Sequence, residues 1–311
     1  MLLVGCGALG CALAQSLARS GVGSLRIVDR DVVDRSNLAR QVLFEDRHAD
    51  EGTPKVDAAA EALARIGGPT AVETHAVHVD ASNVEALLAG VDLVLDGTDN
   101  LATRYVLNDA CVERALPWIY AGVVGGHGLV LPVLPGEGPC LACVFPEPAP
   151  PGSLPSCATA GVLQPAVAAV AALQAGLALR ILAARAGFVP ALHEVDVWHG
   201  TARRIEAARD PACACCVGRR FVHLAGRGAR GVAALCGRDA VQVQAGSPRP
   251  DLGLLADALA GVARAIERRG AILRFEVEEQ RFTVFADGRT LIEGVDDEGR
   301  ALALYDRYVG R

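Results

Sequence analysis

Short apolar runs alternate with stretches of helical periodicity through about the first two thirds of the 311-residue chain. Apolar runs bounded by turn residues predict strands, and apolar positions three or four apart predict helices. Such alternation is typical of an α/β fold with a doubly wound, mostly parallel sheet. The predicted strands are 2–4, 25–29, 71–79, 91–96, 116–123, 129–134, 193–197 and 203–206, and the predicted helices 12–20, 56–65, 83–88, 101–115 and 163–186.

The pattern changes after residue 218. Apolar residues from 252 to 266 recur at helical spacing, and 272–278 and 281–286 alternate as strands do. Asp287-Gly288 is a hairpin turn signal before a further strand at 290–293, and 301–308 is a last helix. We therefore expect two domains, 1–218 and a small C-terminal α+β module at 219–311.

Composition and charge narrow the class of protein. A hydrophobic content of 51% is ample for a packed core, and a net charge of −6 argues against nucleic acid as the main partner. The apolar stretch 162–179 is about the length of a membrane span, but Gln164 and Gln174 favour a buried core helix. The N-terminus lacks the basic region of a secretory signal. We expect a cytoplasmic protein without a membrane anchor.

The first turn carries the glycine pattern Gly5-x-Gly7-x-x-Gly10 between a predicted strand and a predicted helix. That context is typical of a Rossmann-like nucleotide site, although such glycines also occur in ordinary turns. Asp29, at the end of the next strand, is placed to bind ribose hydroxyls, or else it is a loop acid.

Two further positions point to phosphate chemistry. Lys55 follows Pro54 at a helix start, where a cation is unfavourable unless an anion is present, so Lys55 is a candidate phosphate ligand. Asp96 and Asp99 follow a strand at the edge where ligands bind, and a pair of acids beside phosphate suggests Mg²⁺. Asp99 is also a candidate N-cap for the next helix.

The ten cysteines include two C-x-x-C pairs, Cys140 with Cys143 and Cys213 with Cys216. Four thiolates complete the tetrahedral shell of a structural Zn²⁺, whereas a catalytic zinc keeps one position open. We take Cys215 as the spare thiol.

Taken together, these motifs resemble the ThiF/MoeB family, bacterial relatives of the ubiquitin-activating E1 enzymes. The resemblance runs in order over residues 1 to about 218. It argues against a nicotinamide dehydrogenase, a third hypothesis, which the glycine pattern alone would also suit. The matching elements are the glycine turn, Asp29-x-Asp31, Ser36-Asn37-Leu38-x-Arg40-Gln41, Lys55, Asp96-x-x-Asp99-Asn100, the two C-x-x-C pairs and Cys157-Ala-x-Ala-Gly161.

The resemblance implies an ATP-dependent adenylyltransferase acting on the C-terminal glycine of a small ubiquitin-like sulfur carrier protein ending in Gly-Gly. It implies ATP, Mg²⁺ and Zn²⁺ as cofactors, with Arg40, Lys55 and Asp99 in catalysis. Cys157 corresponds to a cysteine that takes the activated carrier in some relatives; the alternative is an inert thiol, because other relatives work without it. The implied nucleotide-binding residues are Gly5, Gly7, Gly10, Asp29, Asp31, Ser36, Asn37, Arg40, Gln41, Lys55, Asp99 and Asn100. A carboxylate is already ionised at neutral pH, so the reaction needs no general base.

The resemblance further implies a homodimer and a sulfur donor as a second partner. Relatives carry a helix before the first strand, with an arginine that enters the partner subunit's site, whereas here the glycine turn begins at residue 5. The alternative expectation is therefore a catalytically impaired, nucleotide- and carrier-binding partner subunit of an E1-like complex. The C-terminal module has no sulfur-transfer loop, and recognition of the carrier is the role we expect for it.

Overall fold

The computed structural model describes residues 1–148, 160–225, 232–234, 240–243, 250–270, 272–295 and 297–310. The chain forms two compact units. Met1–His75 and Val79–Gly226 make up the first, and Ala76–His78 with Arg227–Arg311 make up the second.

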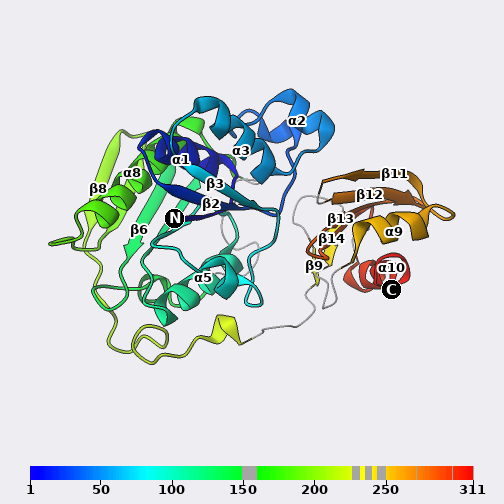
Figure 1. Cartoon of the computed structure of the whole chain (residues 1–311). Coiled ribbons are helices and arrows are strands. Elements are labelled where there is room, and N and C mark those ends of the chain that lie inside the picture. The colour runs from blue at the N-terminus through cyan, green and yellow to red at the C-terminus, as the bar shows by residue number, and fades with distance from the viewer. Residues whose placement is uncertain are drawn as a thin grey trace. The chain divides into compact units, whose positions relative to one another are not determined.

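The first unit is built on an eight-stranded sheet of order β3-β2-β1-β4-β5-β6-β7-β8. The five strands from β3 to β5 run parallel, and β6, β7 and β8 extend the sheet antiparallel (Figure 1). This confirms the doubly wound, mostly parallel sheet. The strands are β1 (Leu2–Val4), β2 (Ser24–Val28), β3 (Ala71–His75), β4 (Val94–Asp96), β5 (Trp118–Val124), β6 (His127–Val133), β7 (Leu192–Asp196) and β8 (Thr201–Ile205).

Helices cover both faces of this sheet. The helices α1, α3 and α8 lie on one face and α5 on the other (Figure 1). The helices are α1 (Ala8–Arg19), α2 (Asp46–Glu51), α3 (Lys55–Ile66), α4 (Val84–Leu87), α5 (Leu101–Glu113), α6 (Leu141–Val144) and α8 (Gln164–Ala183), with 3-10 turns η1 (Arg35–Asn37) and η2 (Val222–Leu224). Parallel strands need such crossover helices, and the helices bury both faces of the central strands.

Within the described residues, α8 is the one helix long and apolar enough to cross a membrane. It packs closely on the sheet: a Cβ placed on Gly128 of β6 would lie 2.3 Å from Cγ2 of Val170. Gln174 is fully buried, and its Nε2 donates to the carbonyls of Asp96 (3.0 Å) and Ile119 (3.2 Å) at the ends of β4 and β5. These contacts are those of a core helix, as the sequence predicts.

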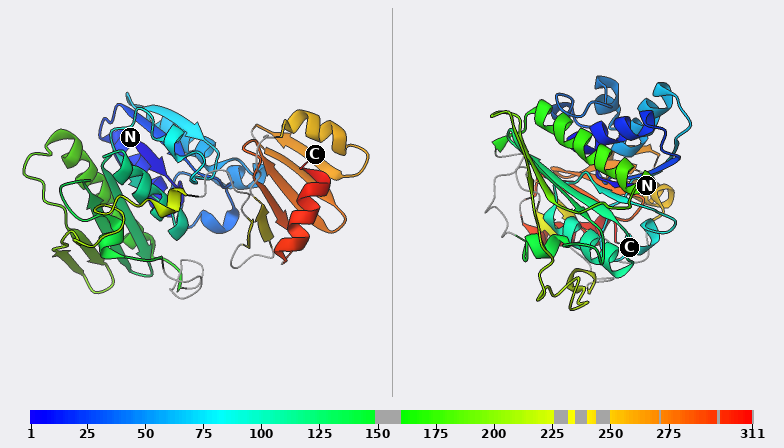
Figure 2. Two further views of the ribbon diagram at one scale, coloured as in Figure 1. Left: turned by 90° about the horizontal axis from the view of Figure 1, so that it is seen from below. Right: turned by 90° about the vertical axis from the view of Figure 1, so that its left-hand side faces the viewer.

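The second unit is an antiparallel sheet of order β11-β12-β13-β14-β10-β9 with two helices (Figure 2). Its core joins one face of the sheet to both helices, through side chains that include Phe275, Phe282, Leu259 and Leu304. The elements are β9 (Val232–Ala234), β10 (Ala240–Val243), α9 (Leu252–Leu259), β11 (Arg264–Arg269), β12 (Ile272–Val277), β13 (Gln280–Phe285), β14 (Thr290–Glu293) and α10 (Glu298–Tyr308).

One predicted element of this unit is wrong. The helical spacing of 252–266 predicts a single helix, but α9 ends at Leu259 and Arg264–Arg269 is a strand that pairs with β12. Gly261 follows the helix end and disfavours its continuation, and Val262 is 62% exposed instead of facing the core. Strand pairing at the edge of the sheet therefore outweighs the local helical spacing.

Candidate functional site

The glycine turn lies between β1 and α1, and its three glycines serve different purposes. Gly5 has a φ of +90°, and a Cβ there would lie 2.6 Å from the backbone of Gly97. A Cβ on Gly10 would lie 2.0 Å from the carbonyl oxygen of Gly5. A Cβ on Gly7, by contrast, would meet its nearest neighbour in the described chain, Nε2 of Gln41, only at 3.9 Å. Packing therefore requires glycine at 5 and 10, but leaves space beside Gly7.

Gly7 is also the N-cap of α1. No side chain of the described residues caps this helix, and its first turn holds no acidic residue. The first backbone N–H groups of a helix have no intrahelical partner, and the dipole places partial positive charge there. The space beside Gly7 is thus bordered by groups that attract an anion.

Asp29, Asp31 and Lys55 form a charged cluster next to this turn. One oxygen of Asp29 accepts from the Cys6 backbone N–H at 2.5 Å and the other from the Asp31 N–H at 2.7 Å. Lys55 Nζ donates to Asp31 Oδ2 at 3.1 Å, although Lys55 is only 7% exposed. The acid that ends β2 is therefore fixed against the glycine turn, with the lysine beside it.

The electrostatics of this cluster keep Lys55 charged. Burial alone would lower the pKa of Lys55, but Asp31, Asp29 and Asp99 outweigh burial and raise that pKa above its ordinary value of 10.5. Burial raises the pKa of Asp29, and Lys55 partly offsets this effect. Lys55 therefore stays a cation that can donate to an oxyanion, in exchange for its present bond to Asp31.

The segment Ser36-Asn37-Leu38-Ala39-Arg40-Gln41 folds back over Gly7. Asn37 Oδ1 accepts from Gln41 Nε2 (2.8 Å) and from Arg40 Nη2 (3.1 Å), and Arg40 Nη1 donates to the Ser36 carbonyl (2.9 Å). Gln41 is 4% exposed, and its Oε1 has no hydrogen-bond partner in the described chain. Ser36 itself is held by Asp34, the N-cap of η1.

The acids after β4 do not act as a pair, and this corrects the sequence-based expectation. Asp96 is fully buried and accepts from Arg104 Nε at 2.8 Å and from the Thr98 backbone N–H at 2.8 Å. Both oxygens of its carboxylate are therefore already hydrogen-bonded within the chain. Asp99 is exposed, and Asn100 rather than Asp99 caps α5, because the Asn100 side chain accepts from the Thr103 N–H at 3.2 Å. Of the two acids, Asp99 is the one whose side chain is exposed.

Sequence reasoning missed Arg104, which organises this edge of the sheet. Besides Asp96, its guanidinium donates to the carbonyls of Thr98 (2.5 Å) and Ala121 (2.9 Å) and lies over the ring of Tyr120. Arg104 is 8% exposed. The signal available in the sequence was a pair of polar residues, Arg104 and Asn108, one helical turn apart in the predicted helix that follows Asp99.

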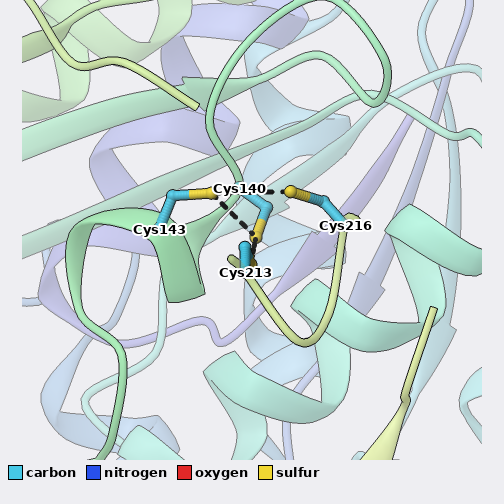
Figure 3. Close-up of side chains that lie close together, drawn as sticks. All are labelled: Cys140, Cys143, Cys213 and Cys216. Atoms are coloured by element: carbon cyan, nitrogen blue, oxygen red, sulfur yellow. Dashed lines mark hydrogen bonds between the residues drawn. The ribbon is translucent and has the colours of Figure 1, made fainter. Parts of the chain in front are cut away.

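The four predicted metal ligands come together in one cluster (Figure 3). The sulfur atoms of Cys140, Cys143, Cys213 and Cys216 all lie within 4.8 Å of one another. Three of the S–S distances are 3.5, 3.6 and 3.8 Å. Four thiolates about 2.3 Å from a tetrahedral Zn²⁺ would lie about 3.8 Å apart, so the cluster matches such a shell.

Asn108 connects the two loops that carry these cysteines. Its Oδ1 accepts from the Leu141 N–H at 2.9 Å, and its Nδ2 lies 3.2 Å from the sulfur of Cys215. The Cys215 sulfur thus contacts Asn108 of α5 and also lies within hydrogen-bond reach of Cys140. It is not among the four clustered sulfur atoms of the described residues. Cys157 lies outside the described residues.

Comparison with known proteins identifies the fold. Residues 1–215 match the ThiF family. The chain belongs to the ThiF family. Crystal structures of E. coli MccB have the same fold, with a TM-score of 0.60 at 21% sequence identity over 70% of this chain and 66% of MccB.

Relatives within this family are named for carrier activation. The sulfur carrier protein ThiS adenylyltransferase of Bacillus subtilis is 34% identical over 312 residues, which cover 99% of this chain and 92% of the relative. The SAMP-activating enzyme E1 of Haloferax volcanii is 42% identical over 58% of this chain and 66% of the relative. The sulfur carrier protein adenylyltransferase of Thermus thermophilus is 38% identical over 70% of this chain and 81% of the relative.

Proposed function

We propose that this ThiF-family protein is an ATP-dependent adenylyltransferase that activates the C-terminal glycine of a ubiquitin-like sulfur carrier protein. The observation that carries the proposal is the space beside Gly7, a glycine at a helix N-terminus that packing does not require. The cluster that holds the buried, charged Lys55 is bonded to the same turn through Asp29 and Cys6. The names of the relatives support adenylation of a carrier rather than another use of a nucleotide.

Binding of ATP would use the groups that already converge at the glycine turn. The α1 N-terminus and Lys55 would hold phosphate oxygens, and Asp29 would accept hydrogen bonds from the ribose through its remaining lone pairs. Asn37 and Arg40 would add phosphate contacts. These contacts would replace the hydrogen bond that the two side chains now make to each other. Six further residues would shape the site through the contacts described above: Gly5, Gly10, Asp31, Ser36, Gln41 and Asn100.

The chemistry is attack of the carrier's terminal carboxylate on the α-phosphorus of ATP. The carboxylate–phosphate bond forms as the bond to pyrophosphate breaks, and negative charge grows on the phosphoryl oxygens and the leaving group. Arg40 and Lys55 would offset that charge with cations that need no rearrangement during the step. Asp99 would bind Mg²⁺, which supplies further neutralisation of the phosphates when bound.

The cysteine cluster would hold one structural Zn²⁺. Its four sulfur atoms fill a tetrahedral shell, which leaves no open position for a substrate. The bound ion would link Cys140 and Cys143, at the start of α6 and within it, to Cys213 and Cys216 in the segment before η2. This link would stabilise the packing of the two segments.

Further parts of the proposal concern partners. We propose a Gly-Gly-ending carrier as substrate, transfer of the activated carrier to Cys157, a sulfur donor, a homodimer and a cytoplasmic location. The alternative of a catalytically impaired partner subunit is not favoured, because the named relatives are adenylyltransferases and the phosphate-side residues are assembled.

A direct test is mass spectrometry of the intact carrier after incubation with ATP and Mg²⁺. The proposal predicts a carrier species heavier by one adenylyl group, which hydroxylamine removes. Asp99→Ala should abolish the species while leaving the melting temperature unchanged, and the exposed acid Glu276→Ala is the matched control. A carrier that remains unmodified with the wild-type enzyme would overturn the proposal.

A further inference from the structure

Two short segments that lie far apart in the sequence carry the four proposed metal ligands. We call residues 140–143 the first ligand segment and residues 213–216 the second. The first segment is a turn in itself, because the Cys143 N–H donates to the carbonyl of Cys140 at 3.1 Å. A bond of this kind fixes the spacing of the cysteines within one pair. It does not fix the distance between the two pairs, which a tetrahedral shell of four thiolates also requires.

A fully buried side chain of α5 contacts both ligand segments. Asn108 Oδ1 accepts from the backbone N–H of Leu141 at 2.9 Å, directly after the ligand Cys140. Asn108 Nδ2 donates to the sulfur of Cys215 at 3.2 Å, directly before the ligand Cys216. Each of the two bonds therefore ends one residue from a proposed ligand, and one amide joins the two segments.

The Asn108 amide has a single orientation that satisfies its surroundings. A backbone N–H can only donate, so the amide oxygen must face Leu141 and the NH₂ group must face Cys215. The NH₂ group also lies 3.5 Å from Oδ1 of Asp109, whose other oxygen accepts from the His223 N–H at 3.0 Å. The donor and the acceptor of this amide are thus both in use.

The helix that carries Asn108 is fixed to the sheet. One turn before Asn108, the Arg104 guanidinium donates to the carboxylate of Asp96 at 2.8 Å and to the carbonyl of Ala121 at 2.9 Å. A side chain on a rigid helix holds its partners more precisely than a side chain on a loop does. Asn108 therefore gives the two ligand segments one fixed point of reference.

We infer that Asn108 is a positioning residue for the cysteine cluster: it holds the two ligand segments at the separation that four thiolates need around one metal ion. The inference rests on the zinc site proposed above. Asn108 acts through the Leu141 backbone and through Cys215, and it is not itself a ligand. Residues that support metal ligands in this way typically change metal affinity about 10- to 100-fold when they are replaced.

The test is competition for zinc between the zinc-loaded full chain and a chromophoric chelator under reducing conditions. Asn108→Leu has a similar volume and lacks both bonds, so it should raise the Kd for zinc about 10- to 100-fold. Cys215→Ala removes only one of the two partners and should raise the Kd by less than about tenfold. Asn108→Ser is too short to reach both segments. It should shift the Kd in the same direction and replaces Asn108→Leu if that variant folds poorly.

A matched control separates positioning from a general loss of stability. Gln174 is another fully buried amide, but it joins the carbonyls of Asp96 and Ile119. Gln174→Leu should lower the melting temperature and yet leave the Kd for zinc within about twofold of wild type, since the two sites are independent.

A second measurement is the rise in melting temperature that zinc produces. A metal ion stabilises the folded chain by an amount that depends on its affinity for that chain. The difference in melting temperature between zinc-loaded and chelator-treated protein should therefore shrink in Asn108→Leu and persist in Gln174→Leu.

The outcomes are distinct. A Kd for zinc in Asn108→Leu equal to that of wild type would overturn the inference, and so would an equal rise of the Kd in Gln174→Leu and Asn108→Leu. Wild-type protein that binds no zinc would overturn the proposed zinc site and this inference together. None of these results bears on the proposed adenylation, which the carrier assay tests separately.

Discussion

At Gly7, unlike at Gly5 and Gly10, the described chain leaves room for a side chain. A methyl group would lie 3.9 Å from its nearest neighbour at Gly7 but 2.0 Å from a backbone oxygen at Gly10. Sequence alone identifies all three glycines as a motif and cannot tell these purposes apart, because the difference depends on which backbone approaches each Cα.

Alanine should therefore have different effects at Gly7 and at Gly10. Gly10→Ala should destabilise the fold by about 3 kcal/mol, because backbone atoms must move to admit the methyl group. Gly7→Ala should leave the melting temperature unchanged but weaken ATP binding about tenfold, because the methyl group occupies the space proposed for phosphate. Thermal melts and calorimetry on both variants check this, and Gly7→Ala binding ATP as wild type does would contradict the proposed phosphate position.

The raised pKa of Lys55 gives a pH prediction. A cation whose pKa is higher in the folded than in the unfolded state contributes stability that is fully present below its ordinary value of 10.5 and lost as pH rises above it. Lys55 should therefore remain charged, and ATP affinity constant, between about pH 7 and pH 9. Calorimetric titrations across this range are the measurement. A loss of affinity in wild type that is absent from Lys55→Met would show that Lys55 titrates near neutrality.

At the scale of elements, the end of β4 and the start of α5 are joined by the buried pair of Asp96 and Arg104. From the sequence, Asp96 and Asp99 after this strand were both expected to bind Mg²⁺. The structure separates them, because Arg104 in the first turn of α5 reaches back to Asp96. Long-range pairing of this kind leaves little trace in local spacing, so Asp96 could not be assigned from the sequence.

Breaking this pair should be costly. Arg104→Met should lower the free energy of unfolding by about 3–5 kcal/mol, because the fully buried Asp96 carboxylate loses its counter-charge. Asp96→Asn combined with Arg104→Met should recover part of that loss. Denaturant unfolding of the two single variants and the double variant gives a double-mutant cycle. Strictly additive losses of the free energy of unfolding would show that the two side chains are not coupled.

The cysteine cluster gives a contrast between neighbouring thiols. Cys213→Ser should reduce bound zinc from about one ion per chain to almost none and lower the melting temperature, because a structural shell needs all four ligands. Cys215→Ser should keep the zinc, since this sulfur is not one of the four that lie within 4.8 Å of one another. Elemental analysis of the purified variants checks both, and equal zinc loss in the two variants would contradict the assigned ligands.

At the scale of the whole molecule, periodicity and motif order were enough to predict the layered α/β unit and an α+β region after it. The strands of the sheet and its doubly wound order follow from patterns that are local in sequence. The end of α9 at Leu259 does not. It depends on the pairing of Arg264–Arg269 with β12, which outweighs the helical spacing of the same residues.

The central claim is that the assembled site adenylates a carrier protein. The most direct measurement is exchange of labelled pyrophosphate into ATP, with and without a ubiquitin-like carrier that ends in Gly-Gly. The account predicts exchange that requires the carrier, disappears when its terminal glycine is removed, and is lost in Asp99→Ala. Exchange that is absent with the intact carrier, or equal without it, would contradict the account.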